Sequence, residues 1–314
     1  MTALRDQNPP EETGIVVVGS LALDTVRTPF GAAEEVLGGS AAYFALAARL
    51  FTPVTLVAVV GKDFPPGDLD RLRQAGINLD HVEVADGPSF RWGGEYGYDL
   101  NSRETLFTHL NVFERFRPRL DEKLKRARYL FLANIDPDLQ RDVLGQVHDP
   151  ELVVCDTMNF WITSKRESLK QTLEDVDVVI LNDGEARQLA EEPNLWKAGR
   201  AILDLGPAVV VIKKGEHGAM LLSREESFTA PSYPVEMVYD PTGAGDSFAG
   251  GFMGYLVANG RHHPGAFRRA VIYGSAAASF CVERFSVEAL LSVCRADLER
   301  RGRELKLISH FDLD

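Results

Sequence analysis

The chain has 314 residues, of which 45% are hydrophobic and 25% charged, with 46 Asp and Glu against 34 Lys and Arg. These proportions are ordinary for a globular protein and exclude a disordered, collagen-like or coiled-coil chain. The net charge of −12 argues against nucleic acid as a partner, because an acidic surface repels phosphate backbones.

The termini and the cysteines indicate a cytoplasmic protein that does not cross a membrane. No run approaches the roughly 20 apolar residues of a membrane span. Residues 1–13 are polar and acidic, which predicts a disordered leader and not a signal peptide. The three cysteines are widely spaced and form no CxxC pair, which indicates free thiols in a reducing compartment.

Short β-branched runs alternate with helix-like segments along most of the chain. Strands are predicted at 15–18, 54–60, 129–132, 152–155, 176–181 and 209–212, and helices at 41–50, 68–75, 137–146, 164–173, 184–190 and 195–205. This alternation predicts an α/β fold with a parallel sheet that helices cover on both faces. A terminal antiparallel hairpin (219–222 and 227–229) and three further helices (243–258, 264–281 and 287–298) follow in the prediction.

The segment 82–111 interrupts this rhythm. It is rich in glycine, aromatic and alternating polar residues, and 91–98 is typical of exposed strands and turns. The segment therefore predicts a small β appendage. In an open parallel sheet, ligands bind at the carboxyl ends of the strands, so the residues that follow each strand are the candidates for a site.

The segment 240–252, Asp-Pro-Thr-Gly-Ala-Gly-Asp-Ser-Phe-Ala-Gly-Gly-Phe, carries the clearest chemistry. Gly243 and Gly245 leave free backbone N–H groups where a helix begins, and such groups bind anions. Asp246 repels an anion there, so its place is explained if it accepts a proton from a hydroxyl that attacks a phosphate. The alternative is an acidic residue that interacts favourably with the helix dipole.

The same segment resembles the C-terminal signature of the PfkB-type carbohydrate kinases, the ribokinase family, and 37–42 resembles that family's N-terminal Gly-Gly motif. The order and spacing match from 15 to about 298. The resemblance implies a ribokinase-like three-layer αβα domain at 14–299, with a mostly parallel central sheet. It also implies a small β-sheet lid, built from segments at about 24–37 and 82–111, and leaves 300–314 as a C-terminal tail.

The resemblance implies an ATP- and Mg²⁺-dependent kinase that phosphorylates a hydroxyl of a small sugar or sugar-like molecule. Asp246 matches the family's catalytic base, and Gly243, Ala244 and Gly245 match its anion hole. Thr242 is expected at the nucleotide. Asp240 lies where many members have a monovalent cation region, so K⁺ is a further candidate, although the stretch 282–286 is not diagnostic.

Two further motifs are expected at the nucleotide. Asn182 and Glu185 resemble the family's Asn-x-x-Glu motif, in which the Glu organises Mg²⁺ through water; the alternative is a helix N-cap. The loop 213–218 resembles the family's nucleotide loop and contributes four candidates, with a plain hairpin turn as its alternative. These candidates are Lys213, Gly215, Glu216 and Gly218, and Lys213 stands where many members carry Thr.

The acceptor side is less clearly marked. Asp24 follows the first strand and suits a pair of adjacent hydroxyls, unless it is a turn residue. Gly38, Gly39, Ser40, Arg91, Tyr96, Asn101, Arg103 and Asn134 are the other candidates for substrate binding. Arg103 suits a phosphorylated sugar or a simple pair with Glu104. Tyr43 departs from the Asn of many members, which leaves the sugar contacts open.

Three alternatives stay open at this stage. The lid aromatics, Phe90, Trp92, Tyr96 and Tyr98, suit either a stacked nucleoside base or a lid-to-lid homodimer. A catalytically silent, regulatory member is disfavoured by the intact Asp246 and Glu185. A dinucleotide oxidoreductase is disfavoured because no GxGxxG follows the first strand.

Overall fold

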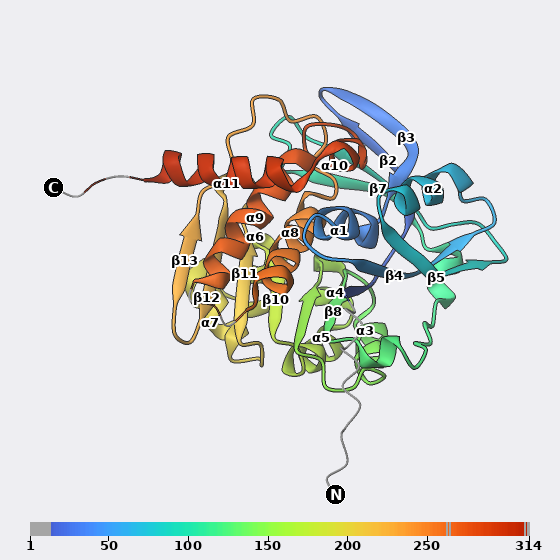
Figure 1. Ribbon diagram of the computed structural model, residues 1–314, viewed down its shortest axis with the longest axis horizontal. Coiled ribbons are helices and arrows are strands. Elements are labelled where there is room, and N and C mark those ends of the chain that lie inside the picture. Colours follow the sequence, from blue (N-terminus) through green and yellow to red (C-terminus); the bar gives the residue numbers. More distant parts are fainter. Residues whose placement is uncertain (1–13, 262, 264, 311, 313–314) are drawn as a thin grey trace, which may run out of the picture.

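The computed structural model describes residues 14–261, 263, 265–310 and 312, and the leader predicted at 1–13 lies outside them. Its main sheet has nine strands in the order β13-β12-β11-β10-β9-β8-β1-β4-β5 (Figure 1). The strands are β1 (Ile15–Val18), β4 (Val54–Gly61), β5 (Ile77–Ala85), β8 (Tyr129–Leu132), β9 (Leu152–Asp156), β10 (Val178–Asn182), β11 (Val209–Lys213), β12 (Ala219–Ser223) and β13 (Ser227–Ala230). Neighbouring strands are parallel except where β12 pairs with β11 and β13. The predicted parallel sheet and its terminal hairpin are confirmed.

Helices cover both faces of this sheet, as expected for parallel strands. One face carries α1 (Ser40–Ala48), α2 (Pro66–Gln74), α8 (Ala244–Asn259), α9 (Ala266–Cys281) and α10 (Glu288–Ser292) (Figure 1). The other carries α3 (Pro137–Leu144), α4 (Asn159–Ser164), α5 (Arg166–Glu174), α6 (Asp183–Ala190) and α7 (Leu195–Leu203). Alternate residues of each strand enter the two cores: Val17 packs on the α8 side, and Val16 and Val18 on the other.

Glycines let α8 lie unusually close to its two neighbours. A Cβ at Gly250 would stand 2.3 Å from the backbone oxygen of Phe44 in α1. A Cβ at Gly251 would stand 2.7 Å from the backbone oxygen of Tyr273 in α9. The Gly-Gly pair thus fixes the depth of α8 in the layer, and with it the position of the helix N-terminus.

A separate four-stranded sheet, which we call the lid, lies beside the carboxyl end of β1. Its order is β3-β2-β6-β7, with β2 (Ala22–Thr28), β3 (Gly31–Gly38), β6 (Arg91–Tyr96) and β7 (Arg103–His109). Strand β2 follows β1 after three residues, so the lid begins where the main sheet ends. The second lid segment was predicted to start at 82, which is wrong, because β5 continues to Ala85 in the main sheet.

The predicted C-terminal tail is also incorrect. Helix α11 (Arg295–Ser309) crosses the top of the view in Figure 1 and packs against α9. Leu298, Arg301 and Leu305 form its buried side. The single helix predicted at 287–298 is instead divided between α10 and α11. The packed domain therefore extends to Ser309.

Among the described residues, no helix combines the length and the apolar character needed to cross a membrane.

Candidate active site

The N-terminus of α8 lies at the carboxyl edge of the main sheet, and the loop before it is shaped by glycine. Gly243 has a left-handed φ of +76°, and a Cβ there would stand 2.3 Å from the ring of Tyr43. The amide of Ala244 donates to Pro241 at 3.2 Å, so that member of the expected anion hole is already engaged. Within the described chain, no backbone carbonyl accepts from the amides of Gly245 and Asp246. These two amides are the free donors that an anion would find there.

Asp246 stands in this first turn, in an environment that favours its protonated form. The pKa of its carboxyl is raised to about 8, mainly by removal from water and also by the charges of Asp156, Asp24 and Glu185, while Lys213 opposes the rise. A carboxyl with this pKa changes its protonation near neutral pH. Asp246 can therefore accept and release a proton during a reaction.

A buried ion pair lies next to Asp246. Lys213, the last residue of β11, places its Nζ 3.0 Å from Oδ2 of Asp156, the last residue of β9. Burial raises the pKa of Asp156, and the ammonium opposes that rise. The same ammonium also interacts with the charges of Asp246 and Glu185, so one lysine is the counter-charge of three neighbouring carboxyl groups.

Asn182 and Glu185 form a reciprocal capping box at the start of α6. The amide of Asn182 donates to Oε2 of Glu185 at 2.7 Å, and the amide of Glu185 donates to Oδ1 of Asn182 at 2.8 Å. The structure thus confirms the capping interpretation of this motif. Burial raises the pKa of Glu185 to about 7, although Lys213 opposes the rise.

A cavity of about 500 Å³ opens between the nucleotide loop and α8. Its lining includes Lys213, Gly215, Glu216, Gly218 and Gly245, so four candidates of the loop and one of the anion hole meet in one place. The left-handed φ of Gly215 and Gly218, +56° and +82°, explains why glycine is needed in this turn.

Much of the remaining lining of this cavity is apolar. Tyr233, Val238, Phe248 and Val282 contribute to it, together with the hydroxyl-bearing Ser279. A nucleotide suits a cavity that combines apolar side chains with free amides and a lysine. Sequence reasoning missed Tyr233 and Val238, because the stretch 231–239 that precedes the 240–252 motif carries no motif of its own.

The site also fits Mg²⁺ in the way this ion binds nucleotide enzymes. No group of three His, Cys, Asp or Glu in the described part of the chain is arranged to hold a metal ion by itself. Mg²⁺ does not need such a cage, because it keeps several waters and binds phosphates through one or two carboxylates. The buried Glu185 would supply one.

On the acceptor side, Asp24 lies against the Gly-Gly turn. A Cβ at Gly38 would stand 1.9 Å from Oδ2 of Asp24, and Gly39 has a left-handed φ of +96° and donates its amide to this carboxylate. Burial raises the pKa of Asp24 to about 7, and the negative charge of Asp240 adds to the rise. Both glycines are required for a buried carboxylate in this place.

The lid reaches the same region through Tyr96 and Arg103. The hydroxyl of Thr242 lies 3.1 Å from that of Tyr96, so Thr242 joins the α8 loop to the lid, and its expected contact with the nucleotide stays a prediction. Arg103 lies opposite Tyr96 in the β6–β7 ladder, and its guanidinium is 5.2 Å from the ring centre of Trp92. Its charge also acts on Asp24.

Four other residues were expected to bind the substrate, and two of them, Ser40 and Arg91, already bond to neighbouring side chains. Ser40 is tied to Ser20, whose hydroxyl lies 3.1 Å away. Arg91 forms ion pairs of 2.7 and 2.8 Å with Glu35 and Asp63.

The other two candidates, Asn101 and Asn134, lie in different parts of the structure. Asn101 lies at the nucleotide loop, because a Cβ on Gly215 would meet its Oδ1 at 2.7 Å. Asn134 follows β8, and its Oδ1 is buried without a hydrogen-bond partner. Asn101 thus lines the cavity beside the loop 213–218, and its expected contact with the acceptor stays a prediction.

Asp240 is buried in the loop before α8 and connects two distant segments. Its carboxylate accepts from the amide of Thr242 at 2.8 Å and from that of Ser286 at 3.2 Å, and its own amide donates to the carbonyl of Val282. The structure therefore brings the stretch 282–286 against Asp240, and a monovalent cation at this place stays a prediction.

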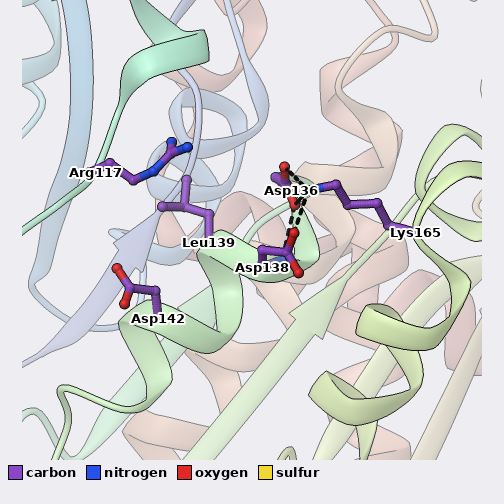
Figure 2. A pocket seen from close by; sticks show the side chains of 6 residues that line it. All are labelled: Arg117, Asp136, Asp138, Leu139, Asp142 and Lys165. Atoms are coloured by element: carbon purple, nitrogen blue, oxygen red, sulfur yellow. Dashed lines mark hydrogen bonds and ion pairs between the residues drawn. The ribbon is translucent and has the colours of Figure 1, made fainter.

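A second cavity, of about 390 Å³, lies on the α3 side and is shown in Figure 2. Lys165 enters between Asp136 and Asp138, with Nζ 2.6 Å from the nearest oxygen of Asp136. Arg117 and Asp142 line its opposite side. None of the residues predicted for catalysis or nucleotide binding lines this cavity, so it is separate from the cavity beside α8.

Comparison with known proteins agrees with this geometry. Residues 13–293 match the model of the pfkB family carbohydrate kinases. A cytidine kinase of Thermococcus kodakarensis is 29% identical over 76% of this chain and 87% of its own length. A deoxyribokinase of Salmonella typhi is 25% identical over 76% of this chain and 80% of its own length. A putative ribokinase II from E. coli, solved in complex with ATP and Mg²⁺, superposes with a TM-score of 0.77 at 21% identity, over 93% of this chain and 99% of its own.

The family and the ribokinase-like fold that the sequence predicted are thereby confirmed, as is the use of ATP and Mg²⁺ in the family. The chain belongs to the pfkB family of carbohydrate kinases and is a phosphotransferase that acts on sugar or nucleoside hydroxyls.

Proposed function

We propose that this kinase phosphorylates a hydroxyl of a nucleoside. The inner face of the lid carries the argument. Asp24 of β2 and Trp92 of β6 are register partners, so their side chains lie side by side on one face. Tyr96 lies four residues after Trp92 in β6, so its side chain points to the same face of the lid. The contact of Tyr96 with Thr242 orients this face toward α8.

This face offers different chemistry at its two ends. Asp24 provides a carboxylate for the adjacent hydroxyls of a ribose. Trp92, half-buried and accompanied by Arg103, provides a flat aromatic surface next to it. A nucleoside has both parts at this spacing, a diol and a planar base, and aromatic side chains bind bases by stacking. The cytidine kinase among the relatives supports this choice of acceptor.

The residues divide the work of transfer. Asp246 removes the proton of the attacking hydroxyl while its oxygen forms a bond to the γ-phosphorus and the bond to the ADP oxygen breaks. The amides of Gly245 and Asp246 stabilise the charge on the transferred group. Bound at Glu185, Mg²⁺ would neutralise phosphate charge. The lid excludes water, which prevents hydrolysis of ATP.

A phosphoryl-transfer screen tests the proposal. Purified protein with ATP and Mg²⁺ is offered nucleosides, free sugars, sugar acids and sugar phosphates, and the Asp246→Asn variant is the blank. We expect ADP and a nucleoside monophosphate. Turnover with free sugars, and none with nucleosides, would contradict the proposed acceptor.

A sugar phosphate is a second candidate, favoured by Arg103. This exposed guanidinium acts on Asp24, and guanidinium groups bind phosphate in bidentate geometry. The sugar-phosphate arm of the screen separates the two acceptors, since Arg103→Ala would abolish activity on the anionic substrate and weaken activity on a neutral one by a smaller factor.

Three finer expectations are kept as proposals. K⁺ is proposed near Asp240, and activity with and without K⁺ tests it.

A homodimer is proposed through the lid, whose edge strand β7 exposes Leu106, and sedimentation tests this homodimer. A cytoplasmic location is supported by Cys155 and Cys281, both buried free thiols.

A further inference from the structure

Lys213 stands where a side chain can reach a phosphate held by α8. A Cβ on Gly245 would lie 2.9 Å from its Nζ, so the ammonium occupies the space that this glycine leaves open at the first turn of the helix. The side chain is 16% exposed and that of its partner Asp156 is 4% exposed. The ammonium is therefore held inside the site and lines the nucleotide cavity.

The charges around Lys213 are unbalanced. Asp156, Glu185 and Asp246 all act on it, and each is a carboxylate once deprotonated. Without the lysine, these three groups would repel a triphosphate from the donors of α8. A single counter-charge in a poorly solvated site has a large effect on an anion, because charges interact more strongly there than in water.

The ion pair is not explained as a device for stability. Buried pairs contribute little net stability, since desolvation of two charges offsets their attraction. Among the described residues Lys213 donates one hydrogen bond, to Asp156, and an ammonium has three N–H donors. Two donors of Lys213 therefore remain for a ligand in the adjoining cavity.

We propose that Lys213 is a catalytic residue that donates hydrogen bonds to the phosphoryl group being transferred, and that Asp156 is a positioning residue that aims it. This inference rests on the proposed function. During transfer the acceptor oxygen bonds to phosphorus, the bond to the ADP oxygen breaks, and the proton goes to Asp246. Lys213 stays protonated throughout and balances the charge on the oxygens of the moving group.

Binding of Mg·ATP and Mg·ADP, measured by calorimetry without any acceptor, tests the contact. ATP carries the phosphoryl group that Lys213 touches and ADP lacks it. We expect Lys213→Met to remove most of the preference for ATP over ADP, a loss of about 10-fold or more, as for other charge-assisted hydrogen bonds. Turnover should fall by about 10²–10³-fold, as when other preorganised donors are removed.

Three further variants separate contact from folding. Lys213→Arg keeps the charge and should keep part of the ATP preference. Asp156→Asn keeps the lysine and should lower kcat more than it changes the affinity for ADP. The double variant Lys213→Met with Asp156→Asn removes both buried charges, so it should unfold at a temperature near that of the native protein and still lack the ATP preference.

The outcomes distinguish this proposal from the proposed function. If Lys213→Met, or the double variant where the single one does not fold, keeps the native ratio of ATP to ADP affinity, the catalytic role of Lys213 is wrong. If the ratio is lost but native protein phosphorylates no nucleoside, the phosphate contact is supported and the proposed acceptor fails.

Discussion

Two structurally different regions surround the active site, and we call them the edge wall and the lid wall. The wall at the carboxyl edge of the main sheet consists of backbone amides, required glycines and buried charges, with Lys213 and Glu185 in fixed contacts. The lid wall consists of side chains on a thin sheet, where Trp92 is half-buried and Arg103 is exposed.

This difference suggests that one region carries out phosphoryl transfer and the other selects the acceptor. In the proposed function, the edge wall binds and transfers a phosphoryl group, a task that is the same for every acceptor. The lid wall would contact the acceptor, and its side chains can change without altering the packed core. A change in the edge wall should therefore reduce turnover with any acceptor, and a change in the lid should alter the choice among acceptors.

The largest effect is expected for Asp246→Asn. The amide cannot accept the hydroxyl proton, and loss of a general base costs about 10²–10⁴-fold in rate. Calorimetry should show that ATP still binds, because the backbone amides remain. Turnover within a few-fold of the native protein would show that Asp246 is not the base and that the edge wall works by binding alone.

A smaller effect, confined to the acceptor, is expected for Trp92→Ala. Loss of a stacked base costs about 1–3 kcal/mol, so the KM for the nucleoside should rise about 5- to 150-fold while the KM for ATP stays unchanged. Phe107→Leu is a matched control, because Phe107 lies over Gly93, on the opposite face of β6. Equal effects of the two variants would mean that Trp92 supports the lid rather than the acceptor.

Much of the edge wall could be predicted from the sequence, because its chemistry is carried by local motifs. Strand β8 has the bounds that its apolar run predicts, and α8 begins one residue from the prediction. A glycine with a required φ or a helix N-terminus can be recognised from neighbouring residues alone. The functional roles of these residues stay predictions until the variants are measured.

The lid and the C-terminal helix could not be predicted in the same way. Arg91 was expected at the acceptor, but its partners Glu35 and Asp63 are 56 and 28 residues away, and no local pattern shows such a pair. In α11, one of the three buried residues is Arg301, which stacks at 3.4 Å on the ring centre of Phe280. A buried arginine weakens the apolar pattern that would have indicated a helix.

The pH dependence of kcat/KM should report how the charges of the edge wall act on Asp246. Asp246 acts when deprotonated, so kcat/KM should rise with pH through its pKa of about 8. The charge of Asp156 raises that pKa, so Asp156→Asn should move the midpoint to lower pH. Four charged groups act on this carboxyl: Asp156, Lys213, Asp24 and Glu185. An unchanged midpoint in kcat/KM profiles of the variant would mean that Asp156 does not influence the base.

The smallest effect is expected where the two walls are joined. Arg91 begins lid strand β6 and pairs with Glu35 in the lid and with Asp63 in the loop after β4. Exposed ion pairs contribute about 0.2–1 kcal/mol each, so Arg91→Gln should lower the free energy of unfolding in urea by about 1 kcal/mol. High salt should reduce this difference, because the pairs are partly exposed. If the variant also raised the KM for the acceptor 10-fold or more at unchanged stability, Arg91 would belong to the recognition surface of the lid.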